Sequence, residues 1–338
     1  MTRISQRTKT ALSVTPLKGL AMFKRINCLV SAFFVLLASG ANHAWADDVR
    51  IGFMPYLPYT NVLYAKEKGL IEDELKKVGL NKGVKWVQFS SGGLVSEGMA
   101  AKELDIGILG IVPAAIGHAA GQDSRIVALG STAPKSHALV VRKDLNISKV
   151  PEIKGKRVAT TYGSTVYELL YRVLDEAGMS IKDIQLVNMQ PADMNISLRN
   201  KTIDAAVVWD PLLPRLVTDG VVNVLRDGTG INDNINVIVA RGPYINEEQG
   251  AIRAVLRGVS RANKDVKADP EAVGAMFATT FDLPKDVATK ALSNYQYSLE
   301  MPMQVKSQIE NSVGFLKEEK IIRRPIDVQK LLDLSLIE

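Results

Sequence analysis

Short apolar runs alternate with longer amphipathic stretches along most of the chain after residue 46. Runs such as 106–109 and 205–208 contain no polar side chain, which is typical of strands buried on both faces of a parallel sheet. The stretches between them have helical patterns, and this rhythm predicts an α/β fold in which helices connect parallel strands. Strands are expected at 49–54, 84–89, 106–109, 126–129, 138–142, 157–160, 184–188, 205–208, 222–225 and 237–240.

From residue 246 the pattern is helical almost to the end. Helices are expected at 247–265, 270–280, 285–292, 303–318 and 326–334. Earlier in the chain, Lys-Glu-Leu-Asp at 102–105 leads into an apolar run and a proline, and Lys-Thr-Ile-Asp at 201–204 does the same. Any α/β protein can repeat such a unit by chance, but the echo is also what two similar lobes would produce.

If the protein has two lobes, the chain must pass from the first lobe into the second and later return to the first. Extended segments near 137–142 and 236–241 are the natural crossings, with a hinge at the pair and a ligand cleft between the lobes. We expect lobe one to comprise residues 47–135 together with the C-terminal part, 241–338, and lobe two to comprise 136–240.

Residues 1–46 have the features of an export leader. Lys24 and Arg25 precede an apolar run at 28–38, and Ala-Trp-Ala at 44–46 supplies a small-residue cleavage site, with Met22 as an alternative start. The run is shorter than the roughly 20 residues that cross a bilayer. Cleavage near Ala46 would release a periplasmic protein that begins at Asp47.

Charge and cysteine content change once the leader is set aside. Residues 1–46 contain six of the 42 basic residues and no acidic residue, which leaves 36 basic against 36 acidic residues. This balance gives no electrostatic argument for binding nucleic acid or an anionic membrane. The single cysteine, Cys28, leaves with the leader, so disulfides, cysteine nucleophiles and cysteine-ligated metals are excluded, and we expect no metal or cofactor.

The loops that follow the predicted strands are the places where open α/β sheets bind ligands. They are 55–59, 90–93, 110–113, 161–165, 190–193 and 209–211. Two of them, SSGG and TYGST, combine hydroxyls and glycine before a predicted helix, where unpaired N–H groups and partial positive charge suit an oxyanion. Alternatively, Ser91 and Ser164 are simply N-caps.

None of these six loops contains Arg or Lys. A carboxylate or phosphate site commonly has a guanidinium fork, whereas neutral donors suit a fully ionised anion such as a sulfonate, sulfate or nitrate. Asp193 and Asp210 would accept the ammonium of a zwitterion such as taurine, or they cap helices. Tyr56, Tyr59, Tyr162 and Trp209 could form aromatic walls, and 295–297 a lid.

At these turns the sequence resembles the alkanesulfonate- and taurine-binding proteins of ABC importers. The resemblance is carried by FSSGGLVSEGMAAKELDIGILG, KGKRVATTYGST, VVWDPLLPRL and RDGTGINDN. It implies a type II periplasmic binding protein, two α/β lobes with a hinge and an interlobe cleft, which delivers its ligand to a membrane permease as a monomer. The residues expected to face the ligand are Tyr56, Tyr59, Ser91, Gly92, Gly110, Ser136, His137, Tyr162, Gly163, Ser164, Thr165, Asp193, Trp209, Asp210 and Asn234.

Other ligands and classes remain open. The PYLPY loop matches neither the alkanesulfonate nor the taurine branch, and a thiamine pyrimidine, nitrate or bicarbonate would suit the same family. Thiamine-precursor synthases share the general fold, but they have a cysteine-rich segment and histidines that this chain lacks after residue 46, apart from His118 and His137. A periplasmic sensor domain would need a transmembrane segment.

Overall fold

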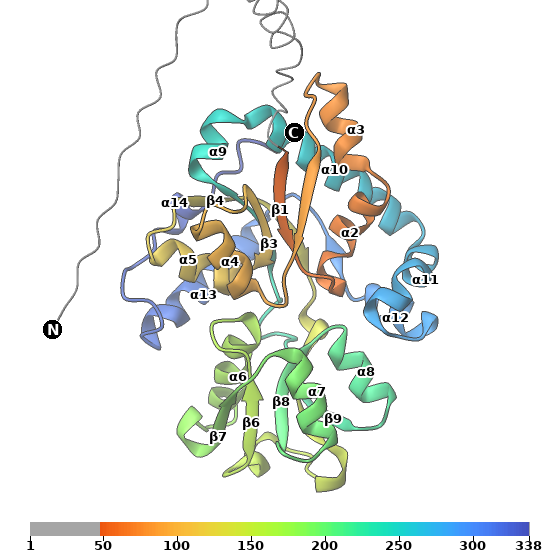
Figure 1. Ribbon diagram of the computed structural model, residues 1–338. Coiled ribbons are helices and arrows are strands. Elements are labelled where there is room, and N and C mark those ends of the chain that lie inside the picture. The colour runs from red at the N-terminus through yellow and green to blue at the C-terminus, as the bar shows by residue number, and fades with distance from the viewer. Residues whose placement is uncertain (1–47, 338) are drawn as a thin grey trace, which may run out of the picture. The chain divides into compact units, whose positions relative to one another are not determined.

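The computed structural model describes residues 48–337. The expected leader and its cleavage site at Ala46 lie outside these residues. Within 48–337 the strands form two sheets, one of six strands and one of five. In Figure 1 the second sheet and helices α6, α7 and α8 lie below the first sheet and its helices.

The first sheet has the strand order β11-β4-β10-β3-β1-β2. Strand β1 runs parallel to β2 and β3, and β10 runs antiparallel to β3 and β4. The strands are β1 (Val49–Phe53), β2 (Val84–Gln88), β3 (Ile106–Gly110), β4 (Ser124–Thr132), β10 (Asn236–Arg241) and β11 (Gln296–Tyr297). Its early helices are α2 (Thr60–Glu67), α3 (Leu70–Lys77), α4 (Gly92–Ala100) and α5 (Ile111–Ala119).

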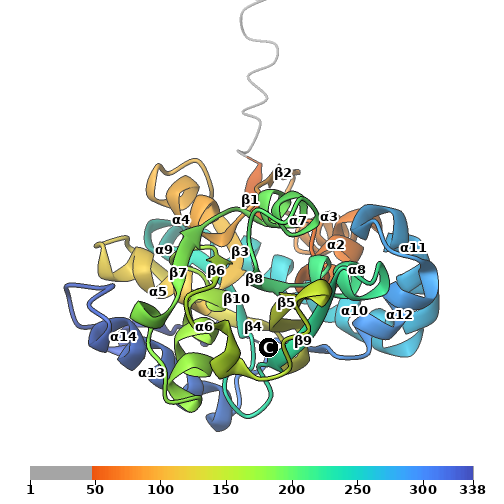
Figure 2. The same ribbon diagram turned by 90° about the horizontal axis from the view of Figure 1, so that it is seen from below.

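The second sheet has the order β7-β6-β8-β5-β9 and is covered on both faces. Alternate residues of β5 explain this: Leu139 and Val141 pack with α6, whereas Ala138 and Val140 pack with α7 and α8. Figure 2 shows these helices on opposite sides of the strands. The elements are β5 (His137–Arg142), β6 (Arg157–Thr160), α6 (Thr165–Glu176), β7 (Gln185–Asn188), α7 (Pro191–Arg199), β8 (Ala205–Trp209), α8 (Leu212–Thr218) and β9 (Val222–Asp227).

The chain passes between the sheets after β4 and returns after β9. Strand β10 therefore belongs to the first sheet, although 236–240 was assigned to lobe two from the sequence. The segments 137–142 and 236–241, which we expected to cross, are regular strands, and the crossings are 133–136 and 228–235. These crossings are joined by bonds from Ala133 N to Asp233 O (2.8 Å) and from Gly228 N to Pro134 O (3.0 Å).

The echoed Asp residues have equivalent surroundings in the two sheets. Asp105 accepts hydrogen bonds from the backbone N–H and guanidinium of Arg50 at the start of β1. Asp204 accepts the same bonds from Arg157 at the start of β6. The lysines three residues before each Asp have left-handed backbones, with φ of 62° and 60°. The repeated Lys and Asp positions thus mark equivalent helix-to-strand connections in the two sheets. The strand order β2-β1-β3-β10-β4 of the first sheet also matches the order β7-β6-β8-β5-β9 of the second.

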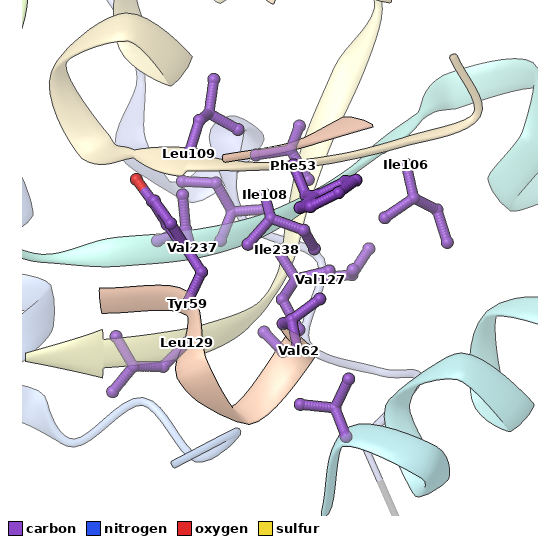
Figure 3. Close-up of a cluster of buried hydrophobic side chains, with 14 of the residues drawn as sticks. Phe53, Tyr59, Val62, Ile106, Ile108, Leu109, Val127, Leu129, Val237 and Ile238 are labelled. Atoms are coloured by element: carbon purple, nitrogen blue, oxygen red, sulfur yellow. The ribbon is translucent and has the colours of Figure 1, made fainter. Parts of the chain in front are cut away.

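The largest core lies in the first sheet (Figure 3), where Phe53, Ile108 and Val237 from three neighbouring strands are buried together. The C-terminal helices complete this part. They are α9 (Gly242–Glu247), α10 (Gln249–Ala268), α11 (Pro270–Phe281), α12 (Lys285–Leu292), α13 (Met303–Glu318) and α14 (Val328–Leu331). Short 3-10 helices lie at Leu57–Tyr59, Pro134–Ser136, Lys143–Leu145, Val150–Ile153 and Ile181–Asp183. Among residues 48–337, no helix combines the length and apolarity needed to cross a membrane.

Two C-terminal segments differ from the sequence-based prediction. The helix predicted over 326–334 is only the four residues of α14, because Leu332 bridges to Ile126 and Asp333 N donates to the Ile126 carbonyl. The strand β11 was not predicted, since two residues leave no periodic pattern. Edge pairing with β4 fixes both segments.

Candidate functional site

A cavity of about 190 Å³ lies where the loops of the two sheets face each other. Ten of the residues predicted to face a ligand line it. They are Tyr56, Tyr59, Ser91, Gly92, Gly110, Tyr162, Ser164, Thr165, Trp209 and Asn234. They come from the loops after β1, β2, β3, β6 and β8 and from the crossing before β10. The ends of these strands therefore bring together the loops that were predicted to bind the ligand.

The starts of three helices reach this cavity. Ser91, Gly110 and Ser164 occupy the N-cap positions of α4, α5 and α6, and neither serine side chain caps its own helix. The Ser164 hydroxyl instead donates to the Thr161 carbonyl at 2.5 Å. First-turn N–H groups without a side-chain acceptor, at the positive end of a helix dipole, attract an anion. The simple N-cap alternative for Ser91 and Ser164 is thus wrong for their side chains.

Gly110 and Thr165 bring the two sheets into close approach. A Cβ at Gly110 would lie 2.7 Å from the Thr165 hydroxyl oxygen, which is closer than side chains tolerate. Gly110 ends β3 in the first sheet, and Thr165 begins α6 beside the second. Glycine at 110 therefore allows the hydroxyl of Thr165 to reach the cavity from the opposite side.

Tyrosine and asparagine side chains form the cavity wall next to the crossing. Tyr59 donates from its hydroxyl to Asn236 Oδ1 at 3.0 Å, and Asn236 Nδ2 donates to the Asn234 carbonyl at 2.8 Å. Burial raises the pKa of Tyr59, so its hydroxyl stays protonated and can donate. Tyr56 and Trp209 meet edge to face, with ring centroids 6.4 Å apart, although they belong to different sheets. These contacts hold the tyrosine, tryptophan and asparagine side chains of the cavity wall in place.

The charge of the lining is low. No Lys or Arg belongs to it within residues 48–337, and the acidic residue there is Glu97 of α4. Hydroxyl, amide and backbone N–H groups are the donors that remain. Neutral donors of this kind suit an anion that is ionised at every physiological pH, because such an anion needs no counter-charge to deprotonate it.

Asp193 and Asp210 do not line the cavity. Asp193 is exposed in the first turn of α7 and is not its N-cap, which is Gln190. Asp210 is buried and accepts a hydrogen bond from the Tyr295 hydroxyl at 3.0 Å. The N-cap of α8 is Pro211. Neither acid therefore stands where a bound ammonium was expected, and Tyr295 holds Asp210 instead of acting as a lid.

Ser136, His137 and Gly163 also lie off the cavity lining. The Ser136 hydroxyl accepts from Asn234 Nδ2 at 2.6 Å and donates to the Ala133 carbonyl, so it ties the crossings together. His137 begins β5 and packs against Gly228, and burial lowers its pKa to about 4. Gly163, with φ of 66°, lines an adjacent groove.

A family model described as the NMT1-like family matches residues 44–279. The chain belongs to the NMT1-like family. This membership confirms the family resemblance read from the loop motifs.

Among residues 48–337 there is no cluster of three or more His, Cys, Asp or Glu side chains that could hold a metal ion.

Several relatives and similar solved structures of this NMT1-like chain are named as binding proteins. A protein of Bacillus subtilis (strain 168), named for aliphatic sulfonate binding, is 30% identical over 94% of this chain and 96% of its own length. The periplasmic aliphatic sulphonate binding protein SsuA from Escherichia coli has a TM-score of 0.75 and 26% identity over 86% of this chain and 98% of that one. The alkanesulfonate-binding protein SsuA from Xanthomonas axonopodis pv. citri bound to MOPS has a TM-score of 0.78 and 23% identity over 85% and 98%. The predicted two-lobed fold is confirmed.

Half of the residues that line the cavity of this NMT1-like chain were not among those expected to face the ligand. The residues concerned are Met54, Pro58, Gly93, Leu94, Glu97, Pro113, Thr161, Val166, Gln190 and Asn236. Pro58, Gly93, Pro113, Thr161 and Gln190 lie inside loops that were predicted to bind, although they were not singled out. Met54 directly precedes the first of these loops, and Leu94 and Val166 lie in the first turns of α4 and α6. Glu97 and Asn236 are different, because a helix interior and a strand start carry no loop signal.

Proposed function

We propose that this chain is the substrate-binding protein of a bacterial ABC importer, which captures a small organosulfonate, either taurine or an alkanesulfonate, and delivers it to a membrane permease. It is a binding protein and not an enzyme. The observation that carries the proposal is a cavity without Lys or Arg, among the described residues, onto which the starts of α4, α5 and α6 converge. The names of the relatives supply the class of anion.

The same proposal includes the cellular location and state. Export with cleavage near Ala46 would place the protein in the periplasm, where it would act as a monomer without binding nucleic acid. The balanced charge of residues 47–338 supports that part of the proposal. Protein recovered from the periplasm of an expressing bacterium should begin at Asp47 by N-terminal sequencing.

A ligand screen by thermal unfolding tests the function. A ligand that binds only the folded state adds RT ln(1+[L]/Kd), which is about 2.7 kcal/mol at a hundredfold excess over Kd, and raises Tm by several degrees. Taurine, isethionate and short alkanesulfonates are compared with sulfate, nitrate, bicarbonate and a thiamine pyrimidine. We expect the largest shift with a sulfonate. A shift with one of the other compounds and with no sulfonate would contradict the proposal.

A matched pair of variants ties that shift to the cavity. Ser91 lines the cavity, whereas the neighbouring Ser90 is exposed and does not. Ser91→Ala should lower sulfonate affinity by about tenfold to a hundredfold, because a hydrogen bond to a charged group contributes roughly 1.5–3 kcal/mol. Ser90→Ala should bind as the parent does. Equal affinities for both variants would remove this loop from the binding site.

A further inference from the structure

The C-terminal helices of the first lobe, which is the first sheet with its helices, contact the second lobe in two places. Helix α13 meets α6, and the turn between α11 and α12 meets α8. Figure 2 shows α13 and α12 on opposite sides of the second sheet. Any change in the angle between the lobes must therefore alter at least one of these two contacts.

The contact between α6 and α13 is buried and broad. Glu168 and Ser312 are buried and hydrogen-bonded across it at 3.0 Å. The Tyr171 ring packs edge to face on Phe315, with ring centroids 5.4 Å apart, and the Arg172 guanidinium lies 5.6 Å from the centroid of the Phe315 ring. Separating these helices would leave a buried carboxylate without a partner and expose aromatic surface, so this contact resists opening.

The contact between α8 and the α11–α12 turn is narrow and open to solvent. Arg215 Nη1 donates to the Asp282 carbonyl at 2.7 Å and forms an ion pair with the Asp282 carboxylate. The Asp282 side chain is 78% exposed. A hollow of about 400 Å³, lined by Thr218 of α8 and Thr279 of α11, lies beside the pair. An ion pair in such a setting is weak and screened by salt, so it breaks readily.

The two contacts thus differ in how easily they break. We infer that the second lobe opens by rotating about the α6–α13 contact, and that Arg215 is a positioning residue whose ion pair with Asp282 holds the lobes closed. Arg215 does not line the ligand cavity, so it acts through the angle between the lobes. The predicted effect on affinity rests on the proposed function, whereas the rotation can be measured without any ligand.

Arg215 increases affinity by raising the closed fraction of the ligand-free protein. The apparent Kd is the intrinsic Kd divided by the fraction that is competent to bind. An exposed ion pair changes the ratio of closed to open protein by about twofold to fivefold. Arg215→Met keeps the apolar stem but not the charge, so it should raise the Kd for ethanesulfonate by about that factor, as measured by calorimetry.

Two further variants isolate the pair. Asp282→Asn removes the charge, and asparagine tolerates the left-handed backbone at this position, where φ is 53°. The double variant Arg215→Met/Asp282→Asn should bind no more weakly than Arg215→Met alone, because both changes disrupt the same pair. In about 1 M NaCl the parent and Arg215→Met should differ less, because salt screens an exposed pair.

Arg199→Met is the matched control. Arg199 of α7 is exposed and forms an ion pair with Asp219, which follows α8 in the same lobe. This pair does not cross between the lobes, and Asp219 also lies 3.8 Å from Arg215 Nε. Arg199→Met should therefore bind ethanesulfonate as the parent does.

Distances between paired spin labels measure the rotation in the ligand-free protein. The exported protein brings no other cysteine, because Cys28 lies in the expected leader. One label pair joins α8 to α12 and the other joins α6 to α13, each at exposed positions away from the contacts: Val217→Cys with Lys290→Cys, and Asp175→Cys with Gln304→Cys. In Arg215→Met the α8–α12 distance should become longer, and the α6–α13 distance should stay the same.

Two results would overturn the inference: an α8–α12 distance that Arg215→Met leaves unchanged, or an α6–α13 distance that changes as much. Equal Kd values for Arg215→Met and Arg199→Met would also overturn it. If no sulfonate bound to the parent, the proposed function would fail, but the label distances of the ligand-free protein would still decide whether Arg215 holds the lobes closed.

Discussion

Asp210 shows how burial can separate a polar residue from the function that its sequence position suggests. It follows the strand that carries Trp209, yet its carboxyl group is buried against Tyr295. Burial raises the pKa of Asp210 well above its ordinary value of 3.8, while the bond from Tyr295 opposes the shift. The folded state thus holds this proton to higher pH than the unfolded state does, and this group's contribution to the free energy of unfolding falls as pH rises above about 4.

Asp210→Asn should remove that fall, because asparagine cannot ionise and its amide oxygen can still accept from Tyr295. We expect the free energy of unfolding of the variant, relative to the parent, to improve steadily between pH 4 and pH 7 in urea titrations. Its ratio of affinities for taurine and ethanesulfonate should match that of the parent. A selective loss of taurine binding would instead show that Asp210 meets the ligand's ammonium.

At this scale, local sequence patterns predicted residues whose position depends on their own loop. Ser91 and Ser164 follow strands and precede helices, so their place at the cavity could be read directly. The orientation of Asp210 could not, because its partner Tyr295 is 85 residues away. Asn236 was missed for the same reason, since its amide is oriented by Tyr59 from the other end of the chain.

Among the helices, α6 and α13 are joined by a buried polar contact. Ser312 of α13 donates to both carboxylate oxygens of Glu168 in α6 at 3.0 Å, and Arg172 donates to one of them at 2.8 Å. Burial raises the pKa of Glu168, and Arg172 opposes that shift. Since α6 begins at the cavity and packs on the second sheet, while α13 packs against α5 of the first, this contact links the two halves away from the ligand.

Ser312→Ala should lower the free energy of unfolding by about 1–3 kcal/mol, because it removes a partner from a buried carboxylate. Urea unfolding measures the loss. Ser307→Ala is the control, since Ser307 is exposed on the same helix. If both variants lost the same amount, the contact with Glu168 would contribute nothing to stability.

Secondary structure was the most predictable level. Every strand of the second sheet and five of the first lie where they were predicted. The central strands β1, β3, β8 and β10 are almost fully buried and therefore have few polar positions, whereas the edge strands β2, β7 and β9 are partly exposed and contain polar residues. The helix expected at 326–334 was shortened by pairing with β4, which is about 200 residues earlier. Edge contacts of that kind leave no trace in local periodicity.

For the whole molecule, the decisive relationship is the approach of the two sheets at the cavity. The crossings 133–136 and 228–235 connect them, and Gly110 faces Thr165 from the opposite sheet. Sequence patterns indicated two similar units through the Asp105 and Asp204 echo, but they carry no information on how closely the units meet. The absence of a side chain at residue 110 permits the close approach of Gly110 to Thr165.

Gly110→Ala should therefore weaken sulfonate binding without unfolding the protein. The backbone of Gly110, with φ of −70°, accepts alanine, so the added methyl acts through its contact with Thr165, 2.7 Å away. Either the sheets separate or the Thr165 hydroxyl rotates out of the cavity. Overpacking costs about 1–3 kcal/mol, and if that cost falls on the arrangement that binds the ligand, the loss of affinity is about fivefold to 150-fold.

A double-mutant cycle distinguishes this mechanism from general damage. If the new methyl acts through Thr165, then Thr165→Ala should cost less affinity in the Gly110→Ala background than in the parent, because the two changes disrupt the same contact. Gly314→Ala is the control for a glycine substitution, since a Cβ there meets no neighbour within 4 Å. Small-angle scattering should show the parent and Gly314→Ala contracting when ethanesulfonate binds, and Gly110→Ala contracting less. Strictly additive losses of affinity, with equal contraction in all three proteins, would mean that the Gly110 methyl does not act through Thr165 and that closure does not depend on this contact.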